Sequence, residues 1–209
     1  MQDSAAVDRD VYVSRFNRVL AVLVWILDAF VLVGYVWIHA GLPDVFAIVP
    51  VAFVALLTWV ALWRPGLEID DDAIVVRNVF RTISVPWPAL IHVDTKYALT
   101  LFTPDHRYSV WAAPAPGRTG AAMAERRQDR GRVAMAPVAA DGTIRPGDLI
   151  ASESGQAAYL IRERWSRLRD AGRIEAGVAD TTPVGIRVHW WLNGLIAVLL
   201  VASVLVVVF

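Results

Sequence analysis

The chain contains no cysteine, which excludes disulfide bonds, thiolate catalysis and cysteine-based metal sites. Lys96 is its only lysine, and its 20 basic residues balance its 20 acidic residues to a formal charge of zero, so nothing predicts binding to nucleic acid. The sequence also lacks a Gly-rich phosphate loop, a dinucleotide-binding fingerprint and a nucleophile elbow around a serine. These absences predict a protein that is not an enzyme, with no catalytic residue and no bound cofactor.

Two groups of polar residues lack the pattern that a metal site or an acid–base pair requires. Asp70, Asp71 and Asp72 are not followed by the alternating ligands, central Gly and terminal Glu of a calcium loop, so a solvated turn is favoured. The four histidines form no ligand pair at helical spacing. His92 and Asp94 share one face of a predicted strand, where an exposed polar pair is more common than an acid–base couple. We therefore expect no metal site.

Hydrophobic residues make up 56% of the chain and gather in three long blocks. The blocks are Val19–Ile38, Val45–Trp63 and Trp190–Phe209. A helix of about 20 residues spans the roughly 30 Å hydrocarbon core of a bilayer. The first block lacks the cleavage pattern of a signal peptide and leads directly into the second. The sequence therefore predicts a two-helix transmembrane hairpin over residues 19–63 and a third transmembrane helix over residues 188–209.

The positions of arginine predict how these spans are oriented. Basic residues precede the first span, follow the second and precede the third: Arg9, Arg15, Arg18, Arg64 and Arg187. The connection His39–Asp44 contains neither Lys nor Arg. The positive-inside rule then places the N-terminal segment 1–18 and residues 64–187 in the cytoplasm, with the C-terminal end outside. We expect a multi-pass protein of the cell membrane.

Asp28 is the one charged residue within the predicted spans. One interpretation is a carboxylate that couples to protons or ions, because an intramembrane charge is costly and often functional. The other is a protonated or hydrogen-bonded side chain that joins helices, with Thr58 or Trp59 as its partner. The second is favoured, because a three-span protein with no second buried acid and no basic partner makes a poor transporter.

The pattern changes to short alternating segments directly after the second span. Apolar residues recur with a period of two, as in half-buried antiparallel strands, and turn-forming residues separate the segments. The predicted strands are Leu67–Asp70, Ala73–Val79, Thr82–Trp87, Leu90–Thr95, Ala98–Thr103 and Arg107–Ala112. Six short strands at this spacing predict a β domain over residues 64–116, either a barrel or two packed sheets.

Residues 117–149 are rich in Ala, Gly and Arg without periodicity, which predicts a flexible loop. Near a bilayer, its arginines can contact anionic headgroups at about 1 kcal/mol each. The candidates for lipid contact are Arg126, Arg127, Arg130 and Arg132. A solvated linker is the simpler interpretation.

An amphipathic helix is predicted over residues 150–172, with Asp148 as a candidate N-cap and Gly172 at its end. Its apolar face consists of Ala158, Ile161, Trp165 and Leu168. This face is expected to cap the sheet, with Trp165 as the main anchor. Residues 173–187 are then a tether to the third span.

Several short sequence segments resemble those of bacterial pleckstrin-homology (PH) domains. The segments are Arg64–Asp70, Val75–Asn78, Arg81–Thr82, Val85–Trp87 and Tyr108–Pro114. They are similar to actinobacterial membrane proteins with a PH domain of the low-molecular-weight antigen 6 type, in which a two-span hairpin leads directly into the domain. The resemblance implies a PH-like antiparallel β-barrel or sandwich closed by a C-terminal helix. Together with the three hydrophobic blocks, it predicts an α+β membrane protein with three transmembrane helices.

The sequence departs from this family pattern in two places. A PH fold has seven strands, and the candidates for the seventh are Arg132–Met135 and Gly142–Ile144. Phosphoinositide-binding PH domains carry basic side chains between their first two strands, where this chain has Asp70–Asp72. Three carboxylates repel an inositol phosphate, so we expect no phosphoinositide binding.

Together these features predict a non-enzymatic scaffold at the inner leaflet of the membrane. A strand edge or a helix groove would receive a membrane-proximal protein partner. Two alternatives stay open. One is a module that contacts anionic lipid of the bilayer, and the other is a small transport or signalling accessory subunit in which Asp28 matters.

Overall fold

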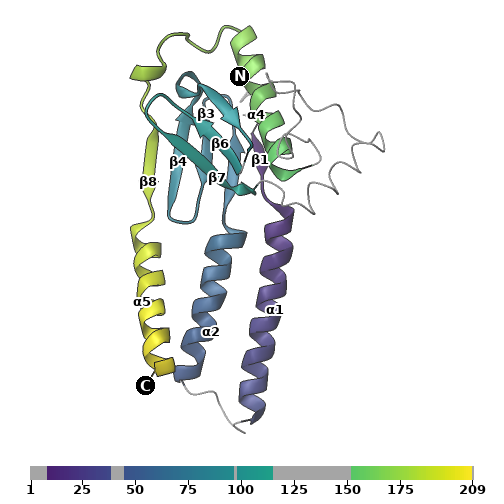
Figure 1. Ribbon diagram of the computed structural model, residues 1–209, viewed down its shortest axis with the longest axis vertical. Coiled ribbons are helices and arrows are strands. Elements are labelled where there is room, and N and C mark those ends of the chain that lie inside the picture. The colour runs from purple at the N-terminus through teal and green to yellow at the C-terminus, as the bar shows by residue number, and fades with distance from the viewer. Residues whose placement is uncertain (1–8, 39–44, 97, 115–151, 209) are drawn as a thin grey trace, which may run out of the picture. The chain divides into compact units, whose positions relative to one another are not determined.

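The computed structural model describes residues 9–38, 45–96, 98–114 and 152–208. The chain divides into two compact units (Figure 1). The first, called the sheet unit below, comprises the chain up to Ser14 together with Gly66–Arg77 and Thr82–Ile186. The second, called the helical unit, comprises Arg15–Pro65, Asn78–Arg81 and Arg187–Phe209.

Two antiparallel sheets contain the strands that the structure describes. The larger has the strand order β1-β2-β3-β4-β8, and the smaller has the order β5-β6-β7. In chain order the strands are β1 (Asp10–Tyr12), β2 (Gly66–Ile69), β3 (Ala73–Arg77), β4 (Arg81–Pro86), β5 (His92–Asp94), β6 (Ala98–Phe102), β7 (Arg107–Pro114) and β8 (Gly185–Val188). Short 3₁₀ turns, η2 (Trp87–Ala89) and η4 (Ala179–Thr181), lie between some of them.

Alternating burial explains why the six segments predicted from the sequence form strands. In β3 and β4 the buried side chains come from every second residue, and the register pairs Ile74 with Val85 and Val76 with Ile83. Such cross-strand pairs of β-branched side chains stabilise a sheet and fix its register, because a slip by one residue would expose all of them. The prediction of packed antiparallel sheets is confirmed.

Two strands lie where the sequence predicted none. β1 belongs to the segment assigned only as a cytoplasmic N-terminus, and it pairs with β2 through Tyr12 opposite Leu67. β8 lies in the segment assigned mainly as a tether, and all four of its residues are exposed. A three-residue strand and a strand with no buried face give no alternation to detect. Both candidates for a seventh strand, 132–135 and 142–144, lie outside the described residues.

Helix α4 (Glu153–Asp170) follows the prediction closely, except at its start. The N-cap is Ser152, whose Oγ accepts a hydrogen bond from the amide of Gly155, so the assignment to Asp148 was wrong. At the other end Gly172 adopts a φ of 70°, and the amide of Arg173 donates to the carbonyl of Leu168. This geometry is a Schellman C-cap, which glycine accommodates without strain.

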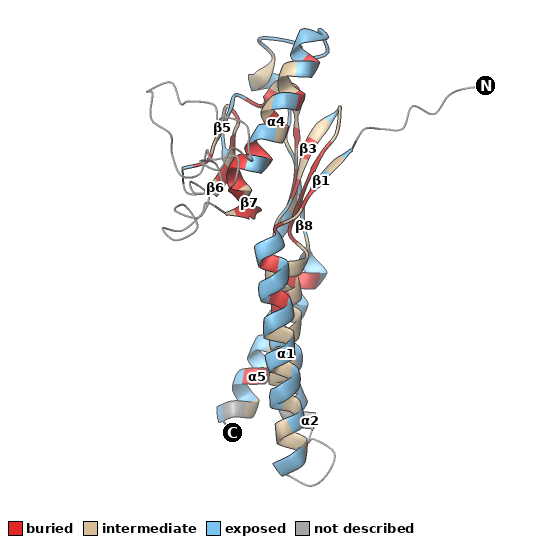
Figure 2. Cartoon of the chain, turned by 90° about the vertical axis from the view of Figure 1, so that its right-hand side faces the viewer, coloured by how far each residue is buried: buried red, intermediate tan, exposed pale blue. Residues whose placement is uncertain are grey.

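The core of the sheet unit lies between the two sheets and α4, which packs on β2, β5, β6 and β7. Figure 2 shows the buried residues of this unit on its strands and on the side of α4 that faces them. Ala158, Ile161 and Leu168 of the predicted apolar face are buried, whereas Trp165 is only partly buried. Arg164, which the sequence did not single out, is the largest fully buried side chain of α4, with 2% of its surface exposed.

Three apolar helical stretches make up the helical unit: α1 (Arg15–Ile38), α2 (Val45–Thr58) continued by the π-helical turn η1 (Trp59–Trp63), and α5 (Trp190–Val208). Helix α2 packs against both α1 and α5 (Figure 1). Of the helices that the structure describes, α1 alone, with 24 residues, is long and apolar enough to cross a membrane. Ile48–Trp63 and Trp190–Val206 are shorter apolar helices.

The turn between β3 and β4, Asn78–Arg81, belongs to the helical unit. Arg64 donates to the carbonyl of Asn78 at 3.2 Å, and the amide of His189 donates to the carbonyl of Phe80 at 3.0 Å. Val79 is buried with Val60 and Leu192. Helix ends that are distant in the sequence therefore meet at one hairpin turn.

Candidate functional site: the groove between β5 and α4

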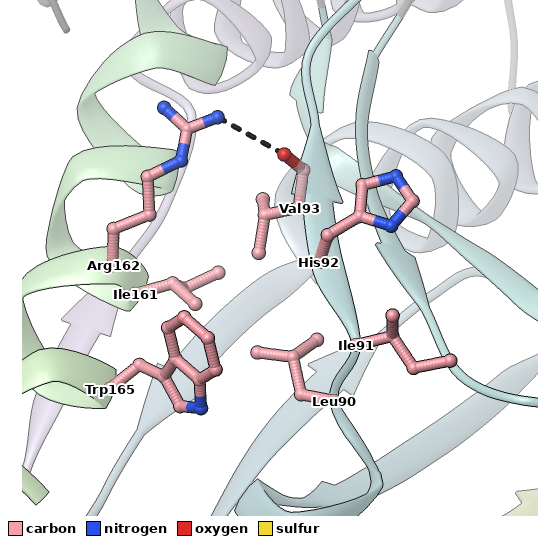
Figure 3. Close-up of a pocket in the computed structure, with 7 residues that line it drawn as sticks. All are labelled: Leu90, Ile91, His92, Val93, Ile161, Arg162 and Trp165. Atoms are coloured by element: carbon pink, nitrogen blue, oxygen red, sulfur yellow. Dashed lines mark hydrogen bonds between the residues drawn. The ribbon is translucent and has the colours of Figure 1, made fainter. Parts of the chain in front are cut away.

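One wall of the groove is the segment that leads into β5. The indole of Trp87 is buried and donates to the carbonyl of Asp70 at 2.9 Å, which fixes the 3₁₀ turn before this segment. Leu90 and Val93 then project toward α4, whereas Ile91 and His92 point away from the helix (Figure 3). The segment is thus apolar on the side that faces α4, and β5 is an outer strand of its sheet as described.

The opposite wall is one face of α4. Ile161 is buried in the core, and the partly buried ring of Trp165 lies one helical turn further along (Figure 3). Arg162 reaches across the groove, and its guanidinium donates to the carbonyl of Val93 at 3.1 Å. This bond satisfies an acceptor of an edge strand, which would otherwise be open to pairing with another chain.

The walls enclose a hollow of about 190 Å³ lined by seven described residues. Its surface is mainly apolar, and the polar side-chain groups among the lining residues are the guanidinium of Arg162, the imidazole of His92 and the indole N–H of Trp165. A concave apolar surface with a few polar groups is the usual form of a binding site. This groove has the shape and chemistry to bind an apolar side chain of a partner, with a cation beside it.

Ion pairs join the buried guanidinium of Arg164 on α4 to β1 and to the turn between β2 and β3. The guanidinium of Arg164 donates to Asp10 Oδ2 at 2.9 Å and to Asp71 Oδ1 at 2.5 Å, and Arg173 Nη1 donates to Asp71 Oδ2 at 2.5 Å. The hydrogen bonds from Arg173 and Arg164 hold the pKa of Asp71 below its usual value. Ser14 adds a bond from the N-terminal segment, since its hydroxyl donates to Glu153 Oε2 at 2.6 Å.

The three consecutive acids form the turn between β2 and β3. Asp70 Oδ1 accepts hydrogen bonds from the amides of Asp72 and Ala73 at 2.9 and 2.7 Å, which closes an Asx turn. Asp71 instead pairs with the two arginines from α4 and the residues after it. The acids therefore act in the fold, and no group of three or more His, Asp and Glu in the described part of the chain could hold a metal ion.

His92 and Asp94 do not form the polar pair that their shared strand face suggested. The ring of His92 stacks on Phe102 of the neighbouring strand, with centroids 4.1 Å apart. Asp94 Oδ1 accepts hydrogen bonds from the amides of Thr95 and Lys96. The two side chains have separate roles, one in cross-strand packing and one in a turn.

The other predicted site residues lie elsewhere. Asp28 lies on α1 beside Pro50, Val51 and Val54 of α2, and not beside the suggested partners Thr58 and Trp59. The suggested lipid contacts fall outside the described residues: Arg126, Arg127, Arg130 and Arg132. Sequence reasoning named a strand edge or a helix groove but none of the groove residues except Ile161 and Trp165, because contact between β5 and α4 spans about 70 residues and leaves no local signal.

A comparison with known families identifies the sheet unit. Residues 64–146 match the family model described as a bacterial PH domain. No curated protein matches the chain, and no solved structure does. The match covers β2 to β7, and the antiparallel sheets followed by a C-terminal helix agree with it. The chain therefore contains a bacterial PH domain at residues 64–146.

Proposed function

We propose that this chain is a membrane-anchored, non-enzymatic interaction module, whose PH domain receives a protein partner in the groove between β5 and α4. The observation that carries the proposal is the apolar hollow of about 190 Å³ bounded by an outer strand and a helix. As in the PH-domain membrane proteins that its sequence segments resemble, the domain would act at the inner leaflet of a bacterial membrane.

An extended peptide is the partner that suits this groove. Alternate side chains of an extended peptide can enter pockets beside the edge of a sheet. Because Arg162 already occupies the carbonyl of Val93, side chains of the peptide rather than its main chain would make the main contact here. One apolar side chain between Leu90 and Trp165 would contribute roughly 2 kcal/mol from burial alone. Arg162 lies at the rim, so an acidic residue next to the apolar one would be favoured.

Exposed apolar surface supports the membrane anchor. Most large side chains of α1 and α5 face outward, which a water-soluble protein rarely tolerates over so large an area. The stretch from Val45 to Trp63 is a continuous helix, and α5 has 19 residues, so each is close to the length that spans a thin bilayer. We propose that all three helical stretches are transmembrane.

The distribution of arginine supports the orientation. With Arg15 and Arg18 at the start of α1 and Arg187 just before α5, the positive-inside rule places the PH domain in the cytoplasm and the C-terminal end outside. Arg18 lies over the ring of Trp63 at 5.1 Å, an aromatic–cation pair suited to the headgroup region. We do not propose phosphoinositide binding, because Asp71 and its neighbours present carboxylates where phosphate would bind.

Photocrosslinking in cells tests the proposal. A photo-reactive amino acid replaces Ile91 beside the groove or, as a matched control, Trp111 on β7 of the same sheet; both side chains are about half exposed. We expect a discrete protein adduct from position 91 only. Arg162→Ala should reduce its yield, whereas Arg167→Ala, on the exposed face of α4, should not.

Two outcomes would contradict the groove. Equal protein adducts at both positions would show that the partner does not select it. Lipid adducts alone, weakening as salt is raised, would favour the alternative of a module that contacts anionic lipid.

A further inference from the structure

A second hollow, of about 270 Å³, lies between α1 and α2. Its lining comes from Val24, Leu27, Asp28 and Val31 of α1 and from Pro50, Val51 and Val54 of α2. The described lining side chains other than Asp28 are thus Val, Leu and Pro, which form no hydrogen bonds. Asp28 is partly exposed there, near the middle of the 24-residue helix α1.

The hollow exists because the two helices are joined on one side of it. The indole of Trp25 donates to the carbonyl of Ala55 at 3.2 Å, and its ring packs on Trp63 with centroids 5.3 Å apart. Beyond these contacts comes Pro50, which lies inside α2, lacks an amide hydrogen and disturbs the helix. The space between α1 and α2 at this level is filled by neither helix.

A carboxyl group in this position needs a partner. An Asp at the centre of a transmembrane helix is costly to insert, and such residues normally pair with another polar group. The three apolar stretches of this chain contain no Lys or Arg that could reach the middle of α1. A second copy would bring another carboxyl and no cation.

We propose that the hollow between α1 and α2 is a docking site for a transmembrane helix of another protein, one that carries a single Lys or Arg near its middle. Charge complementarity selects this occupant, since its cation would lie against Asp28 while small apolar neighbours fit between Val31 and Val54. The proposal rests on the membrane anchor proposed above and gives the scaffold a partner inside the bilayer.

The test uses the full-length chain in vesicles of neutral phosphatidylcholine, with energy transfer to labelled model peptides. One peptide is a 20-residue Leu/Ala helix with a central Lys, and the other has Leu in its place. Interhelical polar contacts are worth about 1–2 kcal/mol in model peptides, so the Lys peptide should bind roughly 5–30-fold more tightly. Asp28→Leu should remove this difference, and Asp28→Asn should retain only part of it.

A variant with the acid moved to another position distinguishes the contribution of the hollow to peptide binding from that of the charge alone. The double variant Asp28→Leu/Phe30→Asp places the carboxyl on an outward face of α1, where Phe30 is 71% exposed. If the Lys peptide binds this variant as tightly as the wild type, the hollow has no role and the proposal is wrong. Equal binding of the two peptides to the wild type would also overturn it.

Two further controls test self-association of the chain and its insertion into the vesicles. Energy transfer between labelled copies of the chain that is lost in Asp28→Leu would make a second copy the occupant and refute the proposal. Extraction with alkaline carbonate reports insertion separately. A chain washed off the vesicles would refute the membrane anchor and this site together, whereas an inserted chain that ignores the Lys peptide would refute the site alone.

Discussion

The ion pairs of Arg164 can be broken from either side, and the two ways should not cost the same. The guanidinium has 2% of its surface exposed, whereas the carboxylates of Asp10 and Asp71 are 44% and 35% exposed. Arg164→Met removes the buried charge and leaves two carboxylates in contact with water. The double variant Asp10→Asn/Asp71→Asn removes the two carboxylates that pair with the buried guanidinium.

The expected magnitudes follow from burial. Hydrogen bonds to charged groups are worth about 1.5–3 kcal/mol each, and exposure of both carboxylates reduces that gain, so Arg164→Met should cost about 2 kcal/mol. An unpaired buried charge costs about 3–5 kcal/mol, and the amides of the double variant recover part of this through hydrogen bonds, which leaves about 3–4 kcal/mol. The carboxylate variant should therefore be the less stable by about 1–2 kcal/mol.

Urea unfolding of the full-length chain in mild detergent, followed by tryptophan fluorescence, measures the difference. Trp87 is buried in the core of the sheet unit and reports its unfolding. Arg167→Met is the matched control, because Arg167 is 55% exposed and its ion pair with Glu163 is long, at 3.5 Å, so the loss of stability should stay within about 0.5 kcal/mol. If Arg164→Met is as destabilising as the carboxylate variant, burial of the guanidinium does not govern the energetics and the reasoning fails.

Three further predictions concern the same unit. The pKa of Asp71 is lowered in the folded state, so the ionised carboxylate stabilises the fold fully above the ordinary aspartate pKa of about 3.9. This stabilisation is lost as the pH falls below that value, so the urea midpoint should drop less in acid for Asp71→Asn than for the wild type. Gly172→Ala should cost about 1 kcal/mol in the same assay because of its positive φ, whereas Gly185→Ala, with ordinary contacts for a new Cβ, should cost less. Two fragments test β1: residues 66–186 alone, and the same residues preceded by residues 9–14 and a short Gly/Ser linker. The first should unfold at a lower urea concentration, because only the second retains β1 and Asp10. Equal midpoints would show that β1 adds no stability.

Local patterns were sufficient to predict most of the PH domain. The predicted segments located every strand from β2 to β7. The period-two signal is clear in β3, β4, β6 and β7, which bury alternate side chains against a common core. The apolar face of α4 was found by its helical spacing, and its end by Gly172. These features depend on neighbours in sequence, which is the information that a single sequence contains.

The parts of the site that were missed depend on distant neighbours. Arg164 was not singled out from the sequence, because charged side chains are rarely buried unless paired, and its partners lie 154 and 93 residues away. The same holds for Arg162 and Val93, which are 69 residues apart. Trp165 was expected to anchor the helix on the sheet, yet it lies at the edge of the core and lines the groove.

The order of segments along the chain explains why β1 was not found. Asp10–Tyr12 lies before α1, whereas its partner β2 begins directly after the second helical stretch, so the whole hairpin of α1 and α2 is inserted between two adjacent strands. A reading that treats the domain as one continuous segment begins at residue 64, as the family match also does, and leaves out the strand that supplies Asp10. A strand that precedes the helical hairpin in the sequence thus completes the sheet of the PH domain that follows it. Loss of β1 would remove Asp10 as an ion-pair partner of Arg164, the buried residue of α4 within the same unit.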